Sequence, residues 1–554
     1  MNSILKKIMM KNSLNKIIPS LLFLSVGALP ALAQNDTLKK PVIEVTSSYK
    51  PALRNSVKIN LYPSAIPADT STPKLTYKIP AQNLFFAYQP VITKPLSLEV
   101  DTSVILGGRN QIKLGFGNLS TPYAAAAFSI GDGKKGILNL YGDYISSKGK
   151  INFQDYSEVS LKSKGSLFTN GHEIYAGIGF YQHQYFNYGY DPASMILYNK
   201  DMLRKKYQDF SLDAGFRNAE LNEAGINYNP HVSFNSFNRE NATNENTISF
   251  ELPAEKKLNE NITVKVSASG NFTNFEINSS SVKFNNHLFQ IAPEVVYSGT
   301  GFTVHGGATP SWNNGELSIL PNLYAEVQLP QNIFTIQAGW VGRYIANSFR
   351  TLSEQNPFIN DPNYFTNTKE ISYYGGIKAS AGQHLSFNAK AAYINYHGFP
   401  LFVNDNISGK GFNLGTESKM NNFQIHGDMN YINQDQFSVT AGVDFNAYTG
   451  LQNYAQAWGL YPLVINGSFR WNALQQVILK ADLISFSGGK ALNRSNIEKD
   501  MKGGTDLSIG SEFKINSVFS AWLDFNNVLN SNYERWNNYP VYGFQVIGGL
   551  IFHF

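Results

Sequence analysis

Residues that could carry out chemistry are few and widely spaced in this sequence of 554 residues. The nine histidines form no HxxxH, HExxH or acidic calcium-loop pattern, so the sequence predicts no metal site. The lack of cysteine excludes disulfides, thiolate metal sites and lipidation at an amino-terminal cysteine. Gly115-Phe-Gly117 is an isolated GxG with no helix after it, and no GxSxG nucleophile elbow occurs. We therefore expect no enzyme, no catalytic residue and no cofactor, although Ser, His and Asp on separate strands could still form a hydrolase site.

The first 33 residues have the pattern of a secretory signal peptide. A start containing four lysines precedes the short apolar stretch Leu21–Leu29, and Ala31-Leu-Ala33 offers small residues at both cleavage positions. An uncleaved membrane anchor is the alternative, but this stretch is shorter than the roughly 20 residues that a spanning helix needs. Met9 or Met10 could equally be the true start. We expect residues 1–33 to be removed during export.

The composition of the remaining chain is unusual for a cytosolic enzyme. Loss of the four lysines lowers the formal net charge from +5 to +1, which gives no electrostatic case for binding nucleic acid. Charged residues make up 15% of the sequence, against a norm of about 25%, while aromatic residues reach 14%. The mean hydropathy is nevertheless negative. A transmembrane β-barrel, with lipid on one face and water on the other, needs this combination.

Residues 34–107 form a distinct proline-rich segment. Because proline cannot donate to a ladder of hydrogen bonds, its eight prolines between Pro41 and Pro95 argue against central strands. An extended arm or a disordered tail both fit residues 34–60. The apolar patch Leu84-Phe-Phe86 with Tyr88 is expected to dock on the rest of the protein.

Residues 108–554 alternate between apolar and polar types with a period of two, which predicts strands. Examples are the stretches 262–273, 385–393, 437–446 and 519–526. A soluble β-sandwich also alternates, but its strands are usually about 5–6 residues long. These runs are closer to the 9–11 residues that cross a membrane at a tilt. We expect an all-β transmembrane antiparallel barrel of about 22 strands.

The connections between these segments alternate in length. Those after even-numbered segments are mostly short, such as Gly131–Lys135 and Asn433–Gln436. Those after several odd-numbered segments are long, such as Phe349–Thr368, Gly398–Thr416 and Asn530–Val541. Short periplasmic turns and long outer loops are typical of barrels in the outer membrane of Gram-negative bacteria. We therefore predict that location.

Polar residues on the inner face of the predicted barrel could line a path for a solute, or they could simply wet its interior. This set comprises Lys265, Lys390, Lys480, Asp444, Asp482 and Asp524. The predicted outer loop around Asn356–Tyr364 could bind a glycan or peptide, or it could only cover the barrel. The basic run Arg204-Lys-Lys206 could contact lipopolysaccharide phosphates or remain a solvated cluster.

The last strand carries a second signal. Leu550, Phe552 and the terminal Phe554 share one face with Phe544 and Val546. An alternating strand that ends in Phe resembles the signal read by the barrel-assembly machinery, although a lipid-facing strand alone would look the same.

The segment before this strand resembles the end of TonB-dependent receptors. Its motifs are Asn526-Asn-Val-Leu-Asn530, Tyr533-Glu-Arg-Trp536 and a final strand that begins Gly543-Phe544. About 35 residues carry this likeness, and their Asn and Tyr richness resembles the Bacteroidetes branch. The family implies a 22-stranded barrel, an amino-terminal plug of roughly 130–150 residues, and a short Ton box that the protein TonB grips.

The amino-terminal segment fits that family only in part. A candidate Ton box is the β-prone stretch Val42, Ile43, Glu44, Val45, Thr46 and Ser47, although short apolar stretches with Thr are common. The roughly 75 residues from Gln34 to the first barrel strand are too few for the family's plug. We therefore expect a rudimentary plug or a partner-binding arm.

Three functions fit the sequence. The first is TonB-dependent-receptor-like transport of a solute too large or scarce for porins. The second is a plugless barrel that serves as a scaffold in an envelope assembly complex, with the arm binding periplasmic or lipoprotein partners. The third is a passive pore.

Overall fold

The computed structural model describes residues 110–131, 133–218, 224–329, 333–382, 384–433 and 436–554, together with two short strands before them. These two strands, β1 (Leu53–Arg54) and β2 (Glu99–Val100), form an antiparallel pair. The predicted signal peptide, the candidate Ton box Val42–Ser47 and the rest of residues 34–107 lie outside the described residues.

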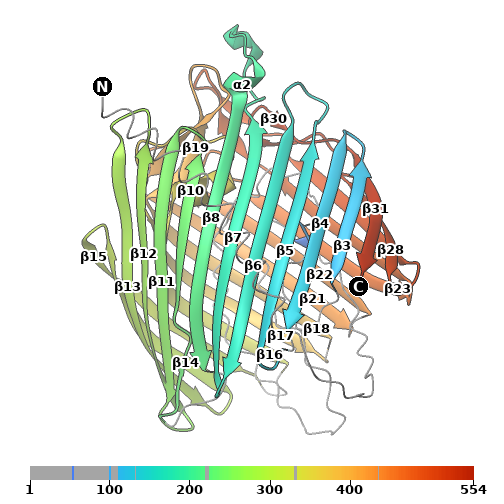
Figure 1. Ribbon diagram of the computed structural model, residues 1–554. Coiled ribbons are helices and arrows are strands. Elements are labelled where there is room, and N and C mark those ends of the chain that lie inside the picture. The colour runs from blue at the N-terminus through green and yellow to red at the C-terminus, as the bar shows by residue number, and fades with distance from the viewer. Residues whose placement is uncertain are drawn as a thin grey trace, which may run out of the picture. The chain divides into compact units, whose positions relative to one another are not determined.

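The described chain forms a closed antiparallel barrel (Figure 1). Its strands are β3 (Gln111–Gly117), β4 (Thr121–Gly131), β5 (Gly136–Ser147), β6 (Tyr156–Thr169), β7 (His172–Phe186), β8 (Arg204–Asn218), β9 (Ile226–Tyr228), β10 (His231–Arg239), β11 (Thr243–Lys257), β12 (Ile262–Ile277), β13 (Lys283–Gly299), β14 (Phe302–Asn313), β15 (Glu316–Gln328), β16 (Phe334–Ile345), β17 (Thr368–Ala381), β18 (Leu385–His397), β21 (Met420–Asn433), β22 (Phe437–Thr449), β23 (Leu463–Leu474), β24 (Val477–Ser487), β27 (Gly504–Lys514), β28 (Phe519–Asn526) and β31 (Gln545–His553).

These 23 strands make a barrel of 22 positions, because β9 and β10 are two parts of one broken strand. Both pair with β11, and Pro230, which cannot donate a backbone hydrogen bond, lies between them. The first strand pairs with the last, with Gly115 opposite Gly549, so the sheet has no free edge. The prediction of about 22 antiparallel strands is confirmed.

Connections at one end of the barrel are mostly long, and those at the other end are short. We call these the loop end and the turn end. The longest loops, at residues 187–203, 346–367, 398–419, 450–462, 488–503 and 527–544, all follow odd-numbered barrel positions. This confirms the predicted alternation.

Small elements occupy these loops, and several are labelled at the top of Figure 1. They are η2 (Pro192–Ser194), α2 (Lys200–Leu203), α3 (Phe349–Gln355), β19 (Phe399–Asn404), β20 (Phe412–Glu417), β25 (Lys490–Leu492), β26 (Glu498–Asp500), β29 (Glu534–Trp536) and β30 (Tyr539–Pro540).

The tightest connections use residues that accept a left-handed backbone. Asn170 and Gly171 join β6 to β7 with φ of 42° and 78°, and Asn314 and Gly315 join β14 to β15 with φ of 50° and 90°. Two-residue hairpin turns of the I′ type need a positive φ at both positions, which Asn and Gly adopt at little cost.

The two faces of each strand differ as the alternation predicted. Large apolar side chains such as Leu167, Ile319 and Leu550 point outward and are more than half exposed. On the inner face of β31, Ile547 and Ile551 are buried. The outward apolar surface is the surface that a barrel presents to lipid. Among the described residues, no helix is long and apolar enough to cross a membrane.

Candidate functional site at the loop end

Three long loops fold together over the loop end of the barrel, and we call this assembly the cap. They are residues 346–367 with α3, residues 398–419 with the β19–β20 hairpin, and residues 527–544 with β29 and β30. The cap contains most of the largest apolar cluster among the described residues, and it is the candidate functional site.

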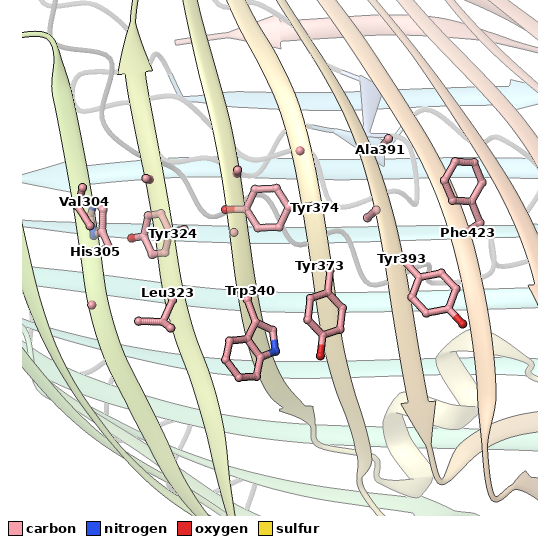
Figure 2. A pocket seen from close by; sticks show the side chains of 16 residues that line it. Val304, His305, Leu323, Tyr324, Trp340, Tyr373, Tyr374, Ala391, Tyr393 and Phe423 are labelled. Carbon is pink, nitrogen blue, oxygen red and sulfur yellow. The ribbon is translucent and has the colours of Figure 1, made fainter.

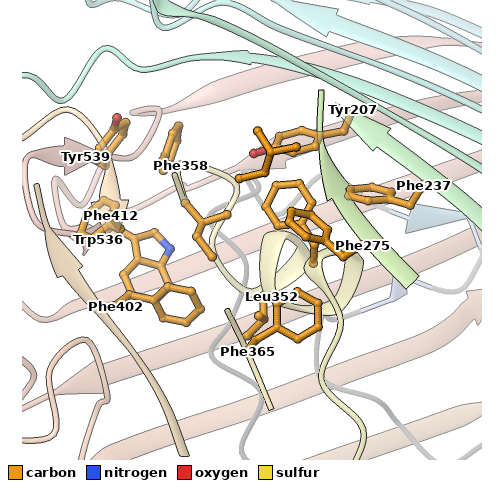
Figure 3. Close-up of a cluster of buried hydrophobic side chains, with 13 residues drawn as sticks. Tyr207, Phe237, Phe275, Leu352, Phe358, Phe365, Phe402, Phe412, Trp536 and Tyr539 are labelled. Atoms are coloured by element: carbon orange, nitrogen blue, oxygen red, sulfur yellow. The ribbon is translucent and has the colours of Figure 1, made fainter. Parts of the chain in front are cut away.

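The centre of the cap is a cluster of buried aromatic and aliphatic side chains (Figure 3). The barrel wall contributes Tyr207, Phe237, Phe275 and Ile277; the first loop contributes Phe349, Leu352, Phe358, Ile359 and Phe365; the other two contribute Phe402, Phe412, Trp536 and Tyr539. The cluster therefore joins three loops to one another and to the wall.

Two ring contacts connect the loops directly. Phe358 stacks on Tyr539 with centroids 3.6 Å apart and planes 21° apart. Trp536 meets Phe402 edge-on at 5.2 Å. Full burial of one large apolar side chain contributes about 1.5–3 kcal/mol, so separating these loops costs several times the thermal energy.

The wall also holds the first loop through polar contacts. The hydroxyl of Tyr207 donates to the carbonyl of Pro357 at 2.9 Å, and Lys205 donates to the carbonyl of Ile359. Arg239 binds Asp361, with Nε 2.8 Å from Oδ1. Tyr207 and Lys205 are buried, and buried polar atoms need such partners, whereas the Arg239–Asp361 pair is partly exposed.

Helix α3 begins at a capping box and is held by a wall carboxylate. Ser348 and Thr351 bond reciprocally through side chain and backbone. Glu245 on β11 accepts from the amides of Phe349 and Arg350, the latter at 3.0 Å. A carboxylate at this position satisfies free amides and complements the positive end of the helix dipole.

The third loop places a buried arginine in the cap. Arg535 is 2% exposed, donates to the carbonyl of Gly459 at 3.1 Å, and lies 4.4 Å from the ring of Trp536 and 5.1 Å from that of Tyr461. Tyr461 in turn donates to the carbonyl of Glu534 at 2.6 Å. Cation–π contacts of this kind strengthen when desolvated.

Two acidic residues fasten the hairpin loop and its neighbour. Glu417 accepts from the amides of Gln452, Asn453 and Tyr454, each between 2.9 and 3.1 Å. Burial alone would raise the pKa of Asp405, but amides from Ser408, Gly411 and Ile407 donate to its carboxylate and hold the pKa below its usual range.

The inner wall below the cap is polar, and most of its charges are paired. All six predicted lumen residues lie on the inner face. Lys480 is 2.9 Å from Asp524, Asp482 is 3.3 Å from Arg470, Asp444 is 2.7 Å from His426, and Lys265 is 3.4 Å from Glu255. The ammonium of Lys390 lies 3.8 Å from the centre of the Tyr374 ring.

The other described positions singled out from the sequence make structural contacts only. Gly115 lies under Trp522, where a Cβ would come within 2.3 Å of the indole. In the basic run, Arg204 and Lys206 share Glu240, whereas Lys205 turns inward to the cap. In the described part of the chain, no group of three or more His, Cys, Asp or Glu side chains is arranged to hold a metal.

The sequence singled out two parts of the cap without predicting their contacts. The structure places the predicted outer loop Asn356–Tyr364 in the cap, where Asn356, Phe358 and Ile359 are buried and Tyr364 is exposed. The Tyr533–Trp536 motif, which carried the family resemblance, supplies the buried Arg535 and Trp536. Glu245, Arg239 and Tyr207 were missed, because on a strand they look like any inward residue.

No family model matches the chain, and no curated protein sequence matches it. Solved structures do. The FrpB iron transporter of Neisseria meningitidis aligns with a TM-score of 0.62 and 11% identity over 81% of this chain and 82% of that one. The siderophore receptor PirA of Acinetobacter baumannii gives 0.62 and 10% identity over 80% of each chain. The ferric enterobactin receptor PfeA of Pseudomonas aeruginosa gives 0.59 and 10% identity over 80% of each.

These similarities establish the fold. The 22-stranded antiparallel barrel expected for this chain is confirmed, and it is similar in fold to these solved structures.

Proposed function

We propose that this chain is an outer-membrane transport protein of the TonB-dependent-receptor type, in which the cap captures a solute and then admits it to the lumen. The cap is the observation that carries this proposal. It is held at the loop end by loop–loop and loop–wall contacts rather than by the strand ladder, so it can move while the 22-stranded ladder stays intact.

The setting of this function is part of the proposal. The apolar outward surface supports insertion in the outer membrane of a Gram-negative bacterium, with the cap facing outside and lipopolysaccharide around it. The barrel-assembly machinery inserts the chain, TonB engages Val42–Ser47, and residues 34–107 act as a partial plug or partner arm. A lipoprotein partner on the outside is part of the same proposal and rests on the resemblance to the Bacteroidetes branch alone.

Conductance across a planar bilayer tests the proposal in four arms. They are the mature chain, the Phe358→Ala/Tyr539→Ala variant, a deletion of residues 34–107, and the two changes combined. We expect a closed wild type and a large open channel only in the combined variant, because cap and arm each block the lumen. Phe513→Ala/Phe519→Ala, which truncates two outward aromatic side chains, is the matched control and stays closed.

Each contrary result has a definite meaning. A conducting wild type would make the protein a passive pore. A combined variant that remains closed would leave no path for a solute and would favour the scaffold. Capture of TonB by a peptide spanning Lys39–Tyr49 tests energised uptake separately, and no binding removes that part of the proposal.

The second candidate, a sealed scaffold barrel, is favoured by one observation. Glu417 and Asp405 are each saturated by backbone amides, as in a permanent structure. A scaffold would co-purify with envelope partners in constant ratio and lose them when residues 34–107 are deleted.

A further inference from the structure

A shallow groove of about 760 Å³ crosses the outward face of β14 to β21. Its floor consists of small residues that pair across neighbouring strands: Ala325 with Ala338, Ala338 with Gly375, and Gly375 with Ala391. At Gly375 an added Cβ would meet nothing nearer than 4.0 Å, so the floor is open. Val304 and Ile425 lie at the two ends of this row.

A ridge of large side chains borders the groove on the side nearer the loop end. Leu323, Trp340, Tyr373 and Tyr393 lie side by side across successive strands (Figure 2). Trp340 and Tyr373 stack with centroids 5.9 Å apart and planes 9° apart. The hydroxyls of Tyr373 and Tyr393 lie at the ring edges nearer the loop end. Amphipathic rings take this orientation at a membrane interface, with their polar edge toward the headgroups.

Three basic side chains lie beyond this ridge: Lys369 on β17, His397 on β18, and Lys419 directly before β21. Lys369 pairs with His397 across β17 and β18, and Lys419 acts electrostatically on the same imidazole. Lys369 is four residues from Tyr373, roughly 13 Å along the strand. Neither Lys369 nor Lys419 has an ion-pair partner among the described residues. From the loop end, the wall therefore carries two lysines beside an imidazole, then an aromatic ridge and then an apolar groove.

We propose that this surface is a binding site for lipopolysaccharide, in which one acyl chain of lipid A fills the groove and its phosphates meet Lys369, His397 and Lys419. The groove is continuous with the apolar surface that the barrel presents to lipid, so hydrocarbon is what surrounds it. The charges of Lys369 and Lys419 set the ligand apart from a zwitterionic phospholipid, because lipid A is an anionic lipid of the leaflet that the loop end faces. This site is separate from Arg204–Lys206, whose outward cations share Glu240.

Native mass spectrometry of the full mature chain with added bis-phosphorylated lipid A tests this site. Dephosphorylated lipid A and phosphatidylglycerol are the comparison probes. We expect the phosphorylated form to bind most tightly. Lys369→Gln and Lys419→Gln should each weaken its binding about fivefold, the contribution of a basic residue near a charged membrane surface. Lys148→Gln, an exposed lysine elsewhere at the loop end, is the matched control and should change binding less than about twofold.

A groove-filling variant tests the acyl chain independently of the charges. Gly375→Leu should weaken binding of both lipid A forms by about tenfold, a loss of about 1.4 kcal/mol. Gly165→Leu places the same side chain outward on β6, where a Cβ meets its neighbours at 3.5 Å or more, and should have no effect. Equal binding of phosphatidylglycerol, or unchanged binding in the lysine variants, would overturn the proposal. A protein dimer that is lost in Gly375→Leu would also overturn it, because a second copy of the chain would then occupy the groove. The test rests on outer-membrane placement and is independent of transport.

Discussion

The ring of Phe358 stacks on that of Tyr539 at a centroid distance of 3.6 Å, although they belong to loops after different and distant strands. Lys410 joins the same place, since Tyr539 donates to its carbonyl. The stack is therefore where all three loops of the cap meet. If the cap opens as proposed, this stack must separate.

Replacing Phe358 with Ala should loosen the cap without unfolding the barrel. The side chain is 3% exposed, and Phe to Ala changes at buried sites cost about 3–5 kcal/mol. Hydrogen exchange of residues 349–367 and 398–417 should accelerate, while exchange in β12 and β22 stays slow. Phe513→Ala, on an outward surface, should leave the loops unchanged. Equal acceleration in the barrel strands would mean that the cap supports the whole fold.

The carboxylate of Glu245 should control helix α3. Glu245→Gln keeps the shape but removes the negative charge from the helix start, and we expect a loss of about 1 kcal/mol in local stability. Exchange of the amides of Phe349 and Arg350 measures this directly. Glu316→Gln, at an exposed carboxylate on the loop end of β15, is the matched control. If the two amides exchange at the same rate in Glu245→Gln and Glu316→Gln, the charge of Glu245 does not stabilise the helix.

The barrel could be predicted because its signals repeat. Alternation of apolar and polar residues gives every strand two faces, and each slip of one residue would put apolar side chains into the lumen. The loop lengths then order the strands. Lys480 and Asp524 were predicted to share the inner face. They lie on either side of β27, and their 2.9 Å contact reaches across Gly510, which pairs with both residues.

The cap could not be predicted in the same way. The contacts of Phe358 with Tyr539 and of Trp536 with Phe402 join residues in irregular loops, where no period relates position to direction. Glu245 and Lys205 have the sequence signature of ordinary inward residues, and only the folded loops distinguish them. The sequence marked Asn356–Tyr364 as an outer loop and Tyr533–Trp536 as a family-like motif, but neither observation predicted that both belong to the cap.

Acid should loosen the turn held by Asp405. The pKa of this carboxyl lies below its usual range, because backbone amides stabilise the charged form more than burial opposes it. Its contribution is therefore fully present above the unfolded-state pKa and is lost as the pH falls through the lower folded-state pKa. Proteolysis within residues 404–411 should become faster over that acidic range. In Asp405→Asn the rate of proteolysis should be higher at neutral pH and should not change with pH. A wild-type rate that is equally independent of pH would contradict the role given to Asp405.

The terminal residue should matter more for insertion than for the finished barrel. Phe554 is about half exposed on the outward face, stacks on Phe552 at 5.2 Å, and meets Phe128 edge-on at 5.9 Å. These exposed contacts contribute little to stability, since each ring already faces lipid. If Phe554 is read during assembly, Phe554→Ser should lower the yield of folded barrel, measured by heat-modifiable migration of outer-membrane fractions. Phe519→Ser, which removes an outward ring from the neighbouring strand, should give a normal yield, and an equal loss in both would indicate a simple need for apolar surface.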